Sequence, residues 1–325
     1  MNFALKAARL PLRKPFAIAG SVYHHCDTLR LTLKEDGLTG TGEAIGVDYL
    51  GESIDSMIGQ LDSIGATIEN GIEHDQLSEI LPAGGARNAL DCALWDLRAK
   101  RENRRVWQLL GVASQPVQTV FTIGIDDPQV MAADAAAAAQ LPKLKIKLDS
   151  HQPIERLEAI RAARPDATLI VDANQGWDRQ QLSDALPHLE RLGIAMLEQP
   201  LPRGSDEDLA GLVTSVPIGA DESIQHSGEF AEISKLYDVI NIKLDKCGGL
   251  TDAMKLVHLA REHDKRLMVG CMVGSSYSMA PAFVIAQACE FVDIDGPLLL
   301  KTDVPGGLEY GPDGVVRPPT PDFWG

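Results

Sequence analysis

Cysteine, long apolar runs and basic charge are all in short supply in this chain, and each shortage excludes a class of protein. The five cysteines are an odd number without a C-x-x-C pair, which favours free thiols in a reducing compartment over a disulfide framework. No run approaches the roughly 18 apolar residues of a membrane-spanning helix. The first twelve residues include Lys6 and Arg9 and lack the apolar core of a signal peptide. We therefore expect a cytoplasmic protein without a membrane partner.

The shortage of basic residues also limits the kind of partner. Lysine and arginine number 30 against 46 aspartates and glutamates, so the formal net charge is −16. Nucleic acids and anionic membranes require a basic face; this balance argues against both and leaves room for metal ions and ammonium groups. Apolar residues make up 45% of the 325 residues, which is enough for a large core, and the length predicts two domains.

The first third of the chain predicts an α+β unit. Residues 16–45 alternate between apolar and polar side chains and read as a β-hairpin with its turn at Gly37. Residues 50–112 read as helices, and the clearest of them spans 86–108 and stops at Gly111. A sheet followed by a helical bundle is the expected order.

From residue 117 onward, short apolar strands alternate with amphipathic helices. Eight such strands predict a (β/α) barrel rather than an open sheet. The candidate strands are 120–124, 144–148, 169–173, 195–199, 218–221, 239–244, 267–271 and 291–295. We therefore divide the chain into an α+β domain, residues 1–112 completed by the tail 305–325, and a barrel domain, residues 113–304.

One glycine-rich segment looks like a dinucleotide-binding loop. Gly40, Gly42 and Gly46 have the spacing G-x-G-x-x-x-G and lie in the second arm of the hairpin. A Rossmann loop must instead join a strand to a helix. We reject the NAD interpretation on this ground.

Three carboxylates occupy corresponding positions at the ends of consecutive barrel strands: Asp172, Glu198 and Asp221. Ligands bind at the carboxyl ends of barrel strands, and neighbouring strand ends lie about 5 Å apart, so the three can converge. Three acidic groups repel one another unless a hard divalent cation lies between them, and oxygen ligands favour Mg²⁺. The alternative is three unrelated surface acids.

Lysines flank this set. Lys147 and Lys243 lie on the second and sixth strands, which are opposite in an eight-stranded ring, and Lys145 shares a face with Lys147. We expect the neighbouring ammonium groups to lower the pKa of one lysine and make it a base. The alternative is that Lys143, Lys145 and Lys147 form the solvated face of an antiparallel strand.

Two bases on opposite sides of one carbon, with a cation beside it, suit one reaction. One lysine removes the proton α to a carboxylate, the cation stabilises the enediolate, and the other lysine returns a proton to the opposite face. Enolase-superfamily enzymes combine a Lys or His base with Mg²⁺ in this way. A dehydratase or cycloisomerase needs only one base and a leaving group.

The sequence resembles the dipeptide epimerases of the enolase superfamily, in particular the L-Ala-D/L-Glu epimerases, from residue 15 to residue 297. Residues 80–97 are similar to the start of a helix in the family's capping domain, and the barrel motifs that match in order are 144–147, 171–177, 197–200, 220–223 and 241–249. The resemblance implies a modified (β/α)7β TIM-type barrel with an α+β capping domain. It also implies one Mg²⁺ per subunit, with Mn²⁺ as the alternative metal, and leaves room for a homo-oligomer.

The resemblance also assigns roles to residues. It makes Asp172, Glu198 and Asp221 the metal ligands, Lys147 and Lys243 the acid/base pair with Lys145 assisting, and Asp293 and Asp295 the site of the substrate's free α-ammonium group. Two carboxylates on one face of a strand suit a cation, and they favour a dipeptide over substrates without an ammonium group. We add Asn174, two residues after Asp172, to the substrate-binding candidates.

The resemblance has one departure. Glutamyl-selective members of the family carry an arginine in the flexible loop of the capping domain, whereas residues 20–27 here contain Tyr23, His24 and His25 instead. A protonated histidine can pair with a carboxylate, or the rings can line a pocket for another side chain, or the loop is simply solvated. If the substrate is Ala-Glu, the setting is salvage of murein peptides.

Three other functions fit parts of the pattern. An o-succinylbenzoate synthase or an N-acylamino-acid racemase would use the same scaffold and would not depend on Asp295. A Schiff-base aldolase would use Lys147 as its nucleophile and need no metal. A non-catalytic sensor of dipeptides or metals would bind its ligand and exchange no α-proton.

Overall fold

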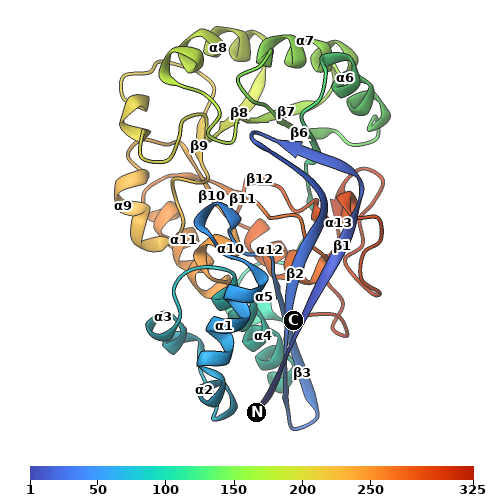
Figure 1. The fold of residues 1–325 in the computed structure, drawn as a ribbon, viewed down its shortest axis with the longest axis vertical. Helices are drawn as coiled ribbons and strands as arrows, with labels where there is room; N and C mark the ends of the chain where they lie inside the picture. Colours follow the sequence, from blue (N-terminus) through green and yellow to red (C-terminus); the bar gives the residue numbers. More distant parts are fainter.

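The computed structural model describes residues 1–325 and consists of two parts (Figure 1). The N-terminal part has a three-stranded antiparallel sheet in the order β1-β2-β3, followed by short helices. Its strands are β1 Asn2–Ile18, β2 Ser21–Glu35 and β3 Leu38–Ala44, and its helices are α1 Ile54–Ser63, α2 Gly65–Glu69, α3 Leu77–Ile80, α4 Gly85–Glu102 and α5 Val106–Leu110, with 3-10 turns η1 Asp48–Leu50 and η2 His74–Gln76.

Two features of this part differ from the sequence prediction. The hairpin is longer, because β1 begins at Asn2 and not near residue 16. In β1 exposed and half-buried residues alternate only in stretches, which are broken at Lys6 and Ala7 and at residues 13–15, and Leu12 alone is fully buried. The single helix expected over 86–108 is two helices, since Asn103 adopts a left-handed conformation (φ 49°) that ends α4 before α5 begins.

Helix α4 packs closely on the sheet and forms the core of the N-terminal part. Leu29, Leu31 and Leu33 of β2 are fully buried in one apolar cluster with the inner face of α4. A Cβ atom at Gly40 or Gly42 of β3 would lie 2.2 or 2.0 Å from a backbone oxygen of α4. Only glycine permits this approach, so the glycine-rich segment serves helix packing, in agreement with our rejection of a dinucleotide loop.

The second part is a barrel of eight parallel strands, which confirms the predicted fold class. The sheet order runs from β12 to β5 without interruption, so each strand pairs with its neighbour in the chain. Val120 N donates to Val292 O (2.9 Å) and joins the start of β5 to the end of β12. The strands are β5 Phe121–Ile123, β6 Lys143–Lys147, β7 Thr168–Asp172, β8 Ile194–Glu198, β9 Ile218–Ala220, β10 Val239–Ile242, β11 Arg266–Val269 and β12 Phe291–Val292.

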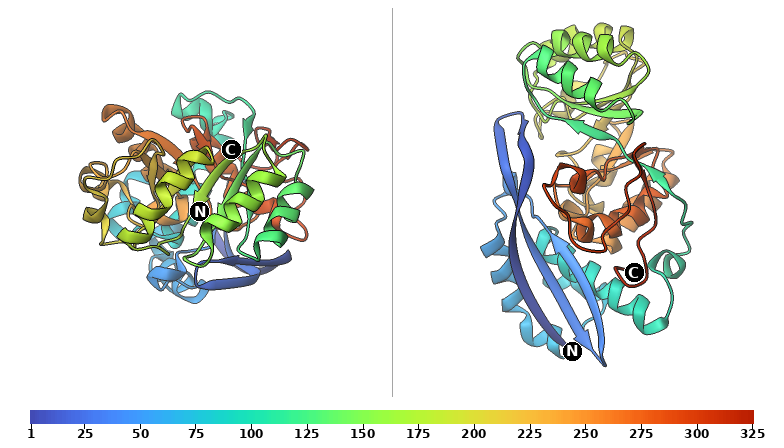
Figure 2. Two further views of the ribbon diagram at one scale, coloured as in Figure 1. Left: turned by 90° about the horizontal axis from the view of Figure 1, so that it is seen from above. Right: turned by 90° about the vertical axis from the view of Figure 1, so that its right-hand side faces the viewer.

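Helices and 3-10 turns lie between the barrel strands (Figure 1). They are α6 Pro128–Ala137, α7 Pro153–Ala163, α8 Arg179–Arg191, η3 Asp206–Leu209, η4 Ser227–Glu229, α9 Phe230–Ile233, α10 Leu244–Cys247, α11 Leu250–Glu262 and α12 Ser276–Ala286, and α13 Gly296–Leu299 follows the last barrel strand. Figure 2 shows the β1–β2 hairpin running alongside the barrel toward α6 and α7. Ile125 N, just after β5, donates to Ala17 O near the hairpin tip (2.9 Å). The tip therefore lies beside the ends of the barrel strands.

The tail contacts both parts. Strand β13 Val315–Val316 pairs with β4 Val117–Gln118 at the start of the barrel region. Trp324 is fully buried, and its Nε1 donates to Thr41 O of β3 (3.0 Å). None of the helices combines the length and apolar character that crossing a membrane requires, and all five cysteines are free thiols, as expected.

Candidate active site

The structure brings the three predicted carboxylates together at the ends of β7, β8 and β9. Asp172 pairs with Glu198 in the register of β7 and β8, and Asp221 follows β9. One oxygen from each side chain lies within 4.8 Å of the others, and all three side chains are buried. A buried set of three carboxylate oxygens without nitrogen or sulfur fits a hard divalent cation.

Lysine side chains surround this carboxylate cluster. Lys147 Nζ lies 2.7 Å from Asp172 Oδ2 on one side, and Lys243 Nζ lies 2.5 Å from Asp221 Oδ2 on the other. Lys145 Nζ lies 3.0 Å from Asp172 Oδ2 and 2.8 Å from Glu198 Oε2. β6 pairs in parallel with β5 and β7, and its Lys145 and Lys147 are buried. The alternative of a solvated antiparallel strand is therefore wrong.

Burial and charge set the ionisation of these groups. Burial alone would raise the pKa of Asp172 and of Asp221, but contacts with lysine ammonium groups outweigh it and hold both pKa values below the ordinary range. Burial and the nearby Asp172 raise the pKa of Glu198 to about 8. Burial would lower the pKa of Lys145, yet Asp293, Glu198 and Asp172 raise it well above its usual value. Of the two neighbouring lysines, Lys145 is therefore not the one with the lowered pKa that the sequence analysis predicted.

Three side chains that the sequence analysis missed hold the carboxylates in place. Asn241 Nδ2 donates to Glu198 Oε1 (2.8 Å), and Lys246 Nζ donates to Asp221 Oδ1 (2.6 Å). Gln199 Oε1 accepts from Asp221 N (2.9 Å). Gln199 and Lys246 lie within motifs 197–200 and 241–249, so their position in those motifs was the available signal.

Gly270, just after β11, makes room for Lys243. A Cβ atom at this position would lie 2.9 Å from Lys243 Cε and 2.7 Å from Asn241 Oδ1. Real Cβ atoms essentially never approach that closely. The absence of a side chain here therefore defines the path of the lysine stem toward Asp221.

A second acidic group lies across Lys145 from the carboxylate cluster. Lys145 Nζ donates to Asp293 Oδ2 (2.8 Å), while Asp293 Oδ1 is buried without a hydrogen-bond partner. Asp295 Oδ2 accepts from Thr122 N (2.6 Å), and burial followed by the charge of Asp293 raises the pKa of Asp295 to about 7. Cys271 Sγ lies within 4.8 Å of a carboxylate oxygen of each aspartate. Asp293 and Asp295 thus approach each other as the sequence predicted.

Asn174 is held between two charged groups of the site. Its Oδ1 accepts from Lys147 Nζ (3.0 Å), and its Nδ2 donates to Glu222 Oε1 (3.2 Å). Glu222 is buried, and burial followed by the charge of Asp221 raises its pKa to about 7. Asn174 therefore orients Lys147 directly.

Residues 20–27, predicted to be a flexible loop, instead lie at the tip of the β1–β2 hairpin and in the start of strand β2, and they contact the turn η1 of the N-terminal part. Tyr23 OH donates to Asp48 Oδ2 (2.8 Å) at the start of η1. In the same turn, Tyr49 OH accepts from Gln225 Nε2 of the barrel (3.0 Å). His24 is exposed. Tyr23 is thus anchored to η1, and η1 is anchored to the barrel.

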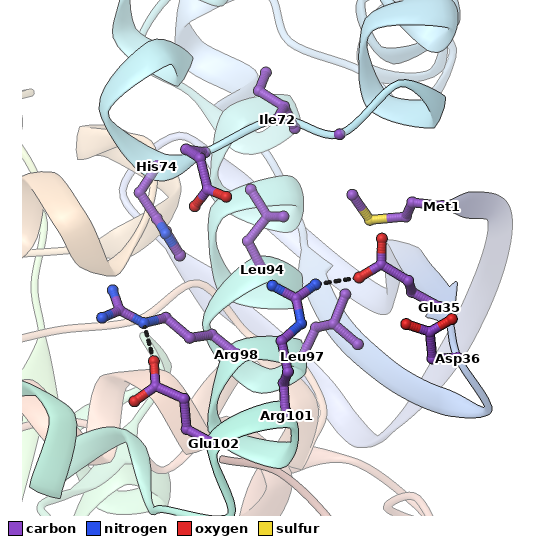
Figure 3. A pocket seen from close by; sticks show the side chains of 12 residues that line it. Met1, Glu35, Asp36, Ile72, His74, Leu94, Leu97, Arg98, Arg101 and Glu102 are labelled. Carbon is purple, nitrogen blue, oxygen red and sulfur yellow. Dashed lines mark hydrogen bonds and ion pairs between the residues drawn. The ribbon is translucent and has the colours of Figure 1, made fainter.

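A cavity of about 580 Å³ lies elsewhere, between the turn after β2 and the far half of α4 (Figure 3). Figure 3 shows Arg98 paired with Glu102 and Arg101 paired with Glu35 in its wall. Leu94 and Leu97 of α4 also line it. Its lining residues include none of the strand-end lysines or carboxylates, so the candidate active site is at the barrel.

Family models match most of the chain. Residues 130–320 match the enolase C-terminal domain-like family, and residues 3–111 match the N-terminal domain of mandelate racemase and muconate lactonizing enzyme. The chain therefore belongs to the enolase superfamily, in its mandelate racemase and muconate lactonizing enzyme branch.

Individual relatives narrow the likeness to dipeptide epimerases and amino-acid racemases. The chain is 42% identical to an L-Ala-D/L-Glu epimerase of Escherichia coli (strain K12), over 92% of this chain and 94% of that one. It is 41% identical to an N-acetyl-D-glutamate racemase of a Pseudoalteromonas species, over 78% of this chain and 80% of that one.

Solved structures agree with this likeness. An Agrobacterium tumefaciens enolase family member with homology to dipeptide epimerases, solved with bound sodium and L-Ala-L-Glu, superposes with a TM-score of 0.97 at 40% identity over 99% of both chains. A dipeptide epimerase from Enterococcus faecalis V583, complexed with Mg and L-Leu-L-Tyr, superposes with a TM-score of 0.91 at 29% identity, over 98% of this chain and 96% of that one. These findings confirm the resemblance to dipeptide epimerases.

Proposed function

We propose that this chain is a Mg²⁺-dependent dipeptide epimerase that inverts one α-carbon by two-base proton transfer. The observation that carries the proposal is the placement of Lys147 and Lys243 on opposite sides of the buried Asp172, Glu198 and Asp221 cluster. A carbon acid between two amines can lose its proton to one and regain a proton from the other on the opposite face. That exchange inverts the configuration.

The roles of the lysines follow from their contacts. Lys147, oriented by Asn174, and Lys243, whose stem passes Gly270, are the two proton carriers. Lys145 lies between the two acidic groups and supplies positive charge near the developing enediolate. Mg²⁺, held by Asp172, Glu198 and Asp221, would neutralise the substrate carboxylate and the charge that develops on it.

The second acidic group supports a dipeptide as the substrate. Asp293 and Asp295 offer two buried carboxylates, and Asp293 Oδ1 has no partner within the protein. A free α-ammonium group satisfies such an acceptor with a charge-assisted hydrogen bond. An N-acylated amino acid has no ammonium group, so the site is poorly matched to it.

L-Ala-L-Glu and its epimer are the first substrates to test, because the E. coli relative is an L-Ala-D/L-Glu epimerase. Tyr23, near the tip of the β1–β2 hairpin, and the exposed His24 are the candidates for contacting the variable side chain. We place the enzyme in the cytoplasm, where its free thiols stay reduced, with murein peptides as the source of the dipeptide. A homo-oligomer is compatible with this role and can be measured by light scattering.

The first experiment is incubation with Mg²⁺ and dipeptides in D₂O. We expect a one-unit mass gain in L-Ala-L-Glu or a related dipeptide as the α-proton is exchanged, together with formation of the epimer. Lys147→Ala and Lys243→Ala should each abolish epimerisation, but each should still exchange the α-proton of one epimer, because one base remains. If both variants lose exchange with both epimers, the two-base mechanism is wrong.

N-acylamino-acid racemisation is the second candidate, and the Pseudoalteromonas relative favours it. Asp295→Asn separates the two functions. We expect this change to impair turnover of a dipeptide strongly and to leave any turnover of N-acetylglutamate unaffected. Exchange of N-acetylglutamate but of no dipeptide by the unaltered protein would replace the proposal with the racemase.

A further inference from the structure

We propose that Cys271, Asp293 and Asp295 form a second metal site, which takes a thiophilic divalent cation such as Zn²⁺ and inhibits the enzyme. The binding site is argued from geometry alone. Its inhibitory effect depends on the proposed function, because inhibition requires that the dipeptide ammonium group uses the same two carboxylates.

The three residues meet because of the strand register at the end of the barrel. Cys271 lies two residues after β11, and Asp293 and Asp295 follow β12, which pairs in parallel with β11. Cys271 Sγ and one oxygen of each carboxylate all lie within 4.8 Å of one another. In tetrahedral zinc sites, sulfur and oxygen ligands lie roughly 3.6 Å apart. Small side-chain rotations bring the three donors to that spacing.

Cys271 differs from the other cysteines in its surroundings. Each of the others donates its thiol to an oxygen acceptor of the protein, namely Cys26 to Val273 O, Cys92 to Asn88 Oδ1, Cys247 to Gly249 O and Cys289 to Ile285 O. Cys271 is partly accessible, as is Cys289, and differs from the other four in lying beside two carboxylates. A metal ligand requires this accessibility.

One residue of this group also carries an unsatisfied acceptor. Asp293 is only 4% exposed, and its Oδ1 has no hydrogen-bond partner, although Oδ2 contacts Lys145. A buried carboxylate oxygen without a partner is unfavourable. A cation held between this carboxylate, Asp295 and the sulfur of Cys271 satisfies it.

The two sites differ in the metal they prefer. Asp172, Glu198 and Asp221 present oxygen only, which suits Mg²⁺, whereas the sulfur of Cys271 adds a soft ligand that favours Zn²⁺ over Mg²⁺. Lys145 lies between the sites and contacts both. Its positive charge screens one acidic group from the other, so occupation of one site does not require the other to be empty.

Metal binding at the second site releases one proton and requires no other chemical change. The Cys271 thiol loses its proton to solvent as sulfur binds the cation, and the two carboxylates supply oxygen ligands without further change. Lys145 keeps its ion pairs with Asp172 and Glu198. The bound cation occupies the position of the substrate ammonium group, so we expect Zn²⁺ to inhibit competitively with the dipeptide.

The direct test is titration of the full-length protein with Co²⁺ in excess Mg²⁺, because thiolate-bound Co²⁺ has a near-ultraviolet charge-transfer band that oxygen-bound Co²⁺ lacks. We expect the band in the unaltered protein and in Cys289→Ser, its loss in Cys271→Ser, and its reduction by L-Ala-L-Glu. Absence of the band in the unaltered protein, or its persistence in Cys271→Ser, would show that Cys271 is not a metal ligand and would overturn the proposed second site.

Inhibition of α-proton exchange by Zn²⁺ gives the second readout. Cys271→Ser should raise the inhibition constant for Zn²⁺ by about tenfold or more, because loss of a direct ligand costs at least as much as loss of a residue that supports one. Cys289→Ser should leave the constant unchanged. Equal inhibition of the unaltered protein and Cys271→Ser would show that Zn²⁺ inhibits at the Mg²⁺ site. It would contradict the inhibitory role of the second site. A Co²⁺ band in a protein that exchanges no dipeptide would keep the site and overturn the proposed function.

Discussion

Each buried lysine of the candidate site is held by specific neighbours, and Lys243 is confined by a glycine as well as by a carboxylate. Its Nζ contacts Asp221, and its stem passes Gly270 with no space for a methyl group. A single atom at position 270 therefore acts on the geometry of a proposed base and on Asn241, which holds Glu198.

Gly270→Ala should displace Lys243 and lower kcat by about tenfold or more, since a shift of about 1 Å at a reacting group has effects of that size. The added methyl group should also lower the free energy of unfolding by roughly 1–3 kcal/mol. Steady-state kinetics on the dipeptide and urea unfolding measure the two effects.

Gly59→Ala is the matched control. Gly59 lies in α1, and a Cβ atom there meets nothing within 4 Å. We expect unchanged kcat and a gain of about 1 kcal/mol in stability, because alanine is the better helix former. A Gly270→Ala enzyme with normal kcat would show that Lys243 tolerates a displaced stem.

At this scale, sequence alone could predict the charged residues on the strands but not the residues that hold them. Asp172 and Glu198 were found because strand ends in a parallel barrel align, and this register rule needs no coordinates. The hydrogen bond from Asp221 N to Gln199 Oε1 depends on the path of the backbone after two different strands, β8 and β9. The proximity of Cys271 to Asp295 likewise depends on how β11 and β12 end.

At the scale of elements, the turn after β8 supports the turn after β9. Gln199 has a left-handed backbone (φ 36°) and is fully buried. Its Oε1 accepts from the backbone N atoms of Asp221 and Ser223, and its Nε2 donates to Tyr237 OH. Ser223 and Tyr237 both contact Asp206 of η3. Gln199 thereby sets the position of Asp221 relative to Glu198.

Gln199→Leu should weaken Mg²⁺ binding by roughly 10- to 100-fold, the usual effect of removing a residue that supports metal ligands. Two backbone N–H groups also lose their acceptor, which should lower the free energy of unfolding by about 2 kcal/mol or more. Calorimetric Mg²⁺ titration measures the first effect. The exposed Gln180→Leu serves as control, and an unchanged Mg²⁺ dissociation constant in Gln199→Leu would contradict the positioning role.

The sequence predicted those elements whose buried positions follow a regular pattern of apolar residues. Elements without such a pattern were not predicted correctly. The barrel strands are short and buried on both faces, so apolar runs between turns mark them. β1 is marked more weakly, because its alternation is interrupted and only Leu12 is fully buried, and it is held by its pairing with β2. The end of α4 depends on the left-handed Asn103, a conformation that only the fold reveals.

At the scale of the whole molecule, the two parts share an apolar interface, in which Cys92, Trp95 and Val106 belong to the same core cluster as the barrel, and polar contacts add to it. Asp245, just after Lys243, accepts from Ile45 N (2.8 Å) and Gly46 N (3.0 Å) at the end of β3. Glu43 accepts from Ser275 N (3.0 Å). Burial raises the pKa of Asp245 to about 6, so this interface contains a titratable group.

The raised pKa of Asp245 gives stability a defined pH dependence. The folded state binds the proton more tightly than the unfolded state, so the contribution of Asp245 is present below its ordinary pKa and is lost as pH rises through about 6. Asp245→Asn keeps an acceptor and carries no charge. We expect the variant to match the unaltered protein near pH 4 and to exceed it in stability by roughly 1–3 kcal/mol near pH 7.

Urea unfolding at a series of pH values measures this difference. Asp36→Asn, in the exposed turn between β2 and β3, is the control and should show no pH-dependent change relative to the unaltered protein. A stability difference for Asp245→Asn that stays constant from acid to neutral pH would show that Asp245 has the same pKa in the folded and unfolded states.

The anchoring of Tyr23 to Asp48 has a consequence for how this enzyme can change over generations. Both residues belong to the N-terminal part, whereas every lysine and carboxylate assigned to the chemistry belongs to the barrel. Given the proposed role of Tyr23 in contacting the variable side chain, mutations in the hairpin tip would alter which side chain is accepted and leave the lysines and carboxylates of the barrel unchanged. Selection for a new dipeptide in a laboratory library can be restricted to a few codons in residues 20–27 and 48–50.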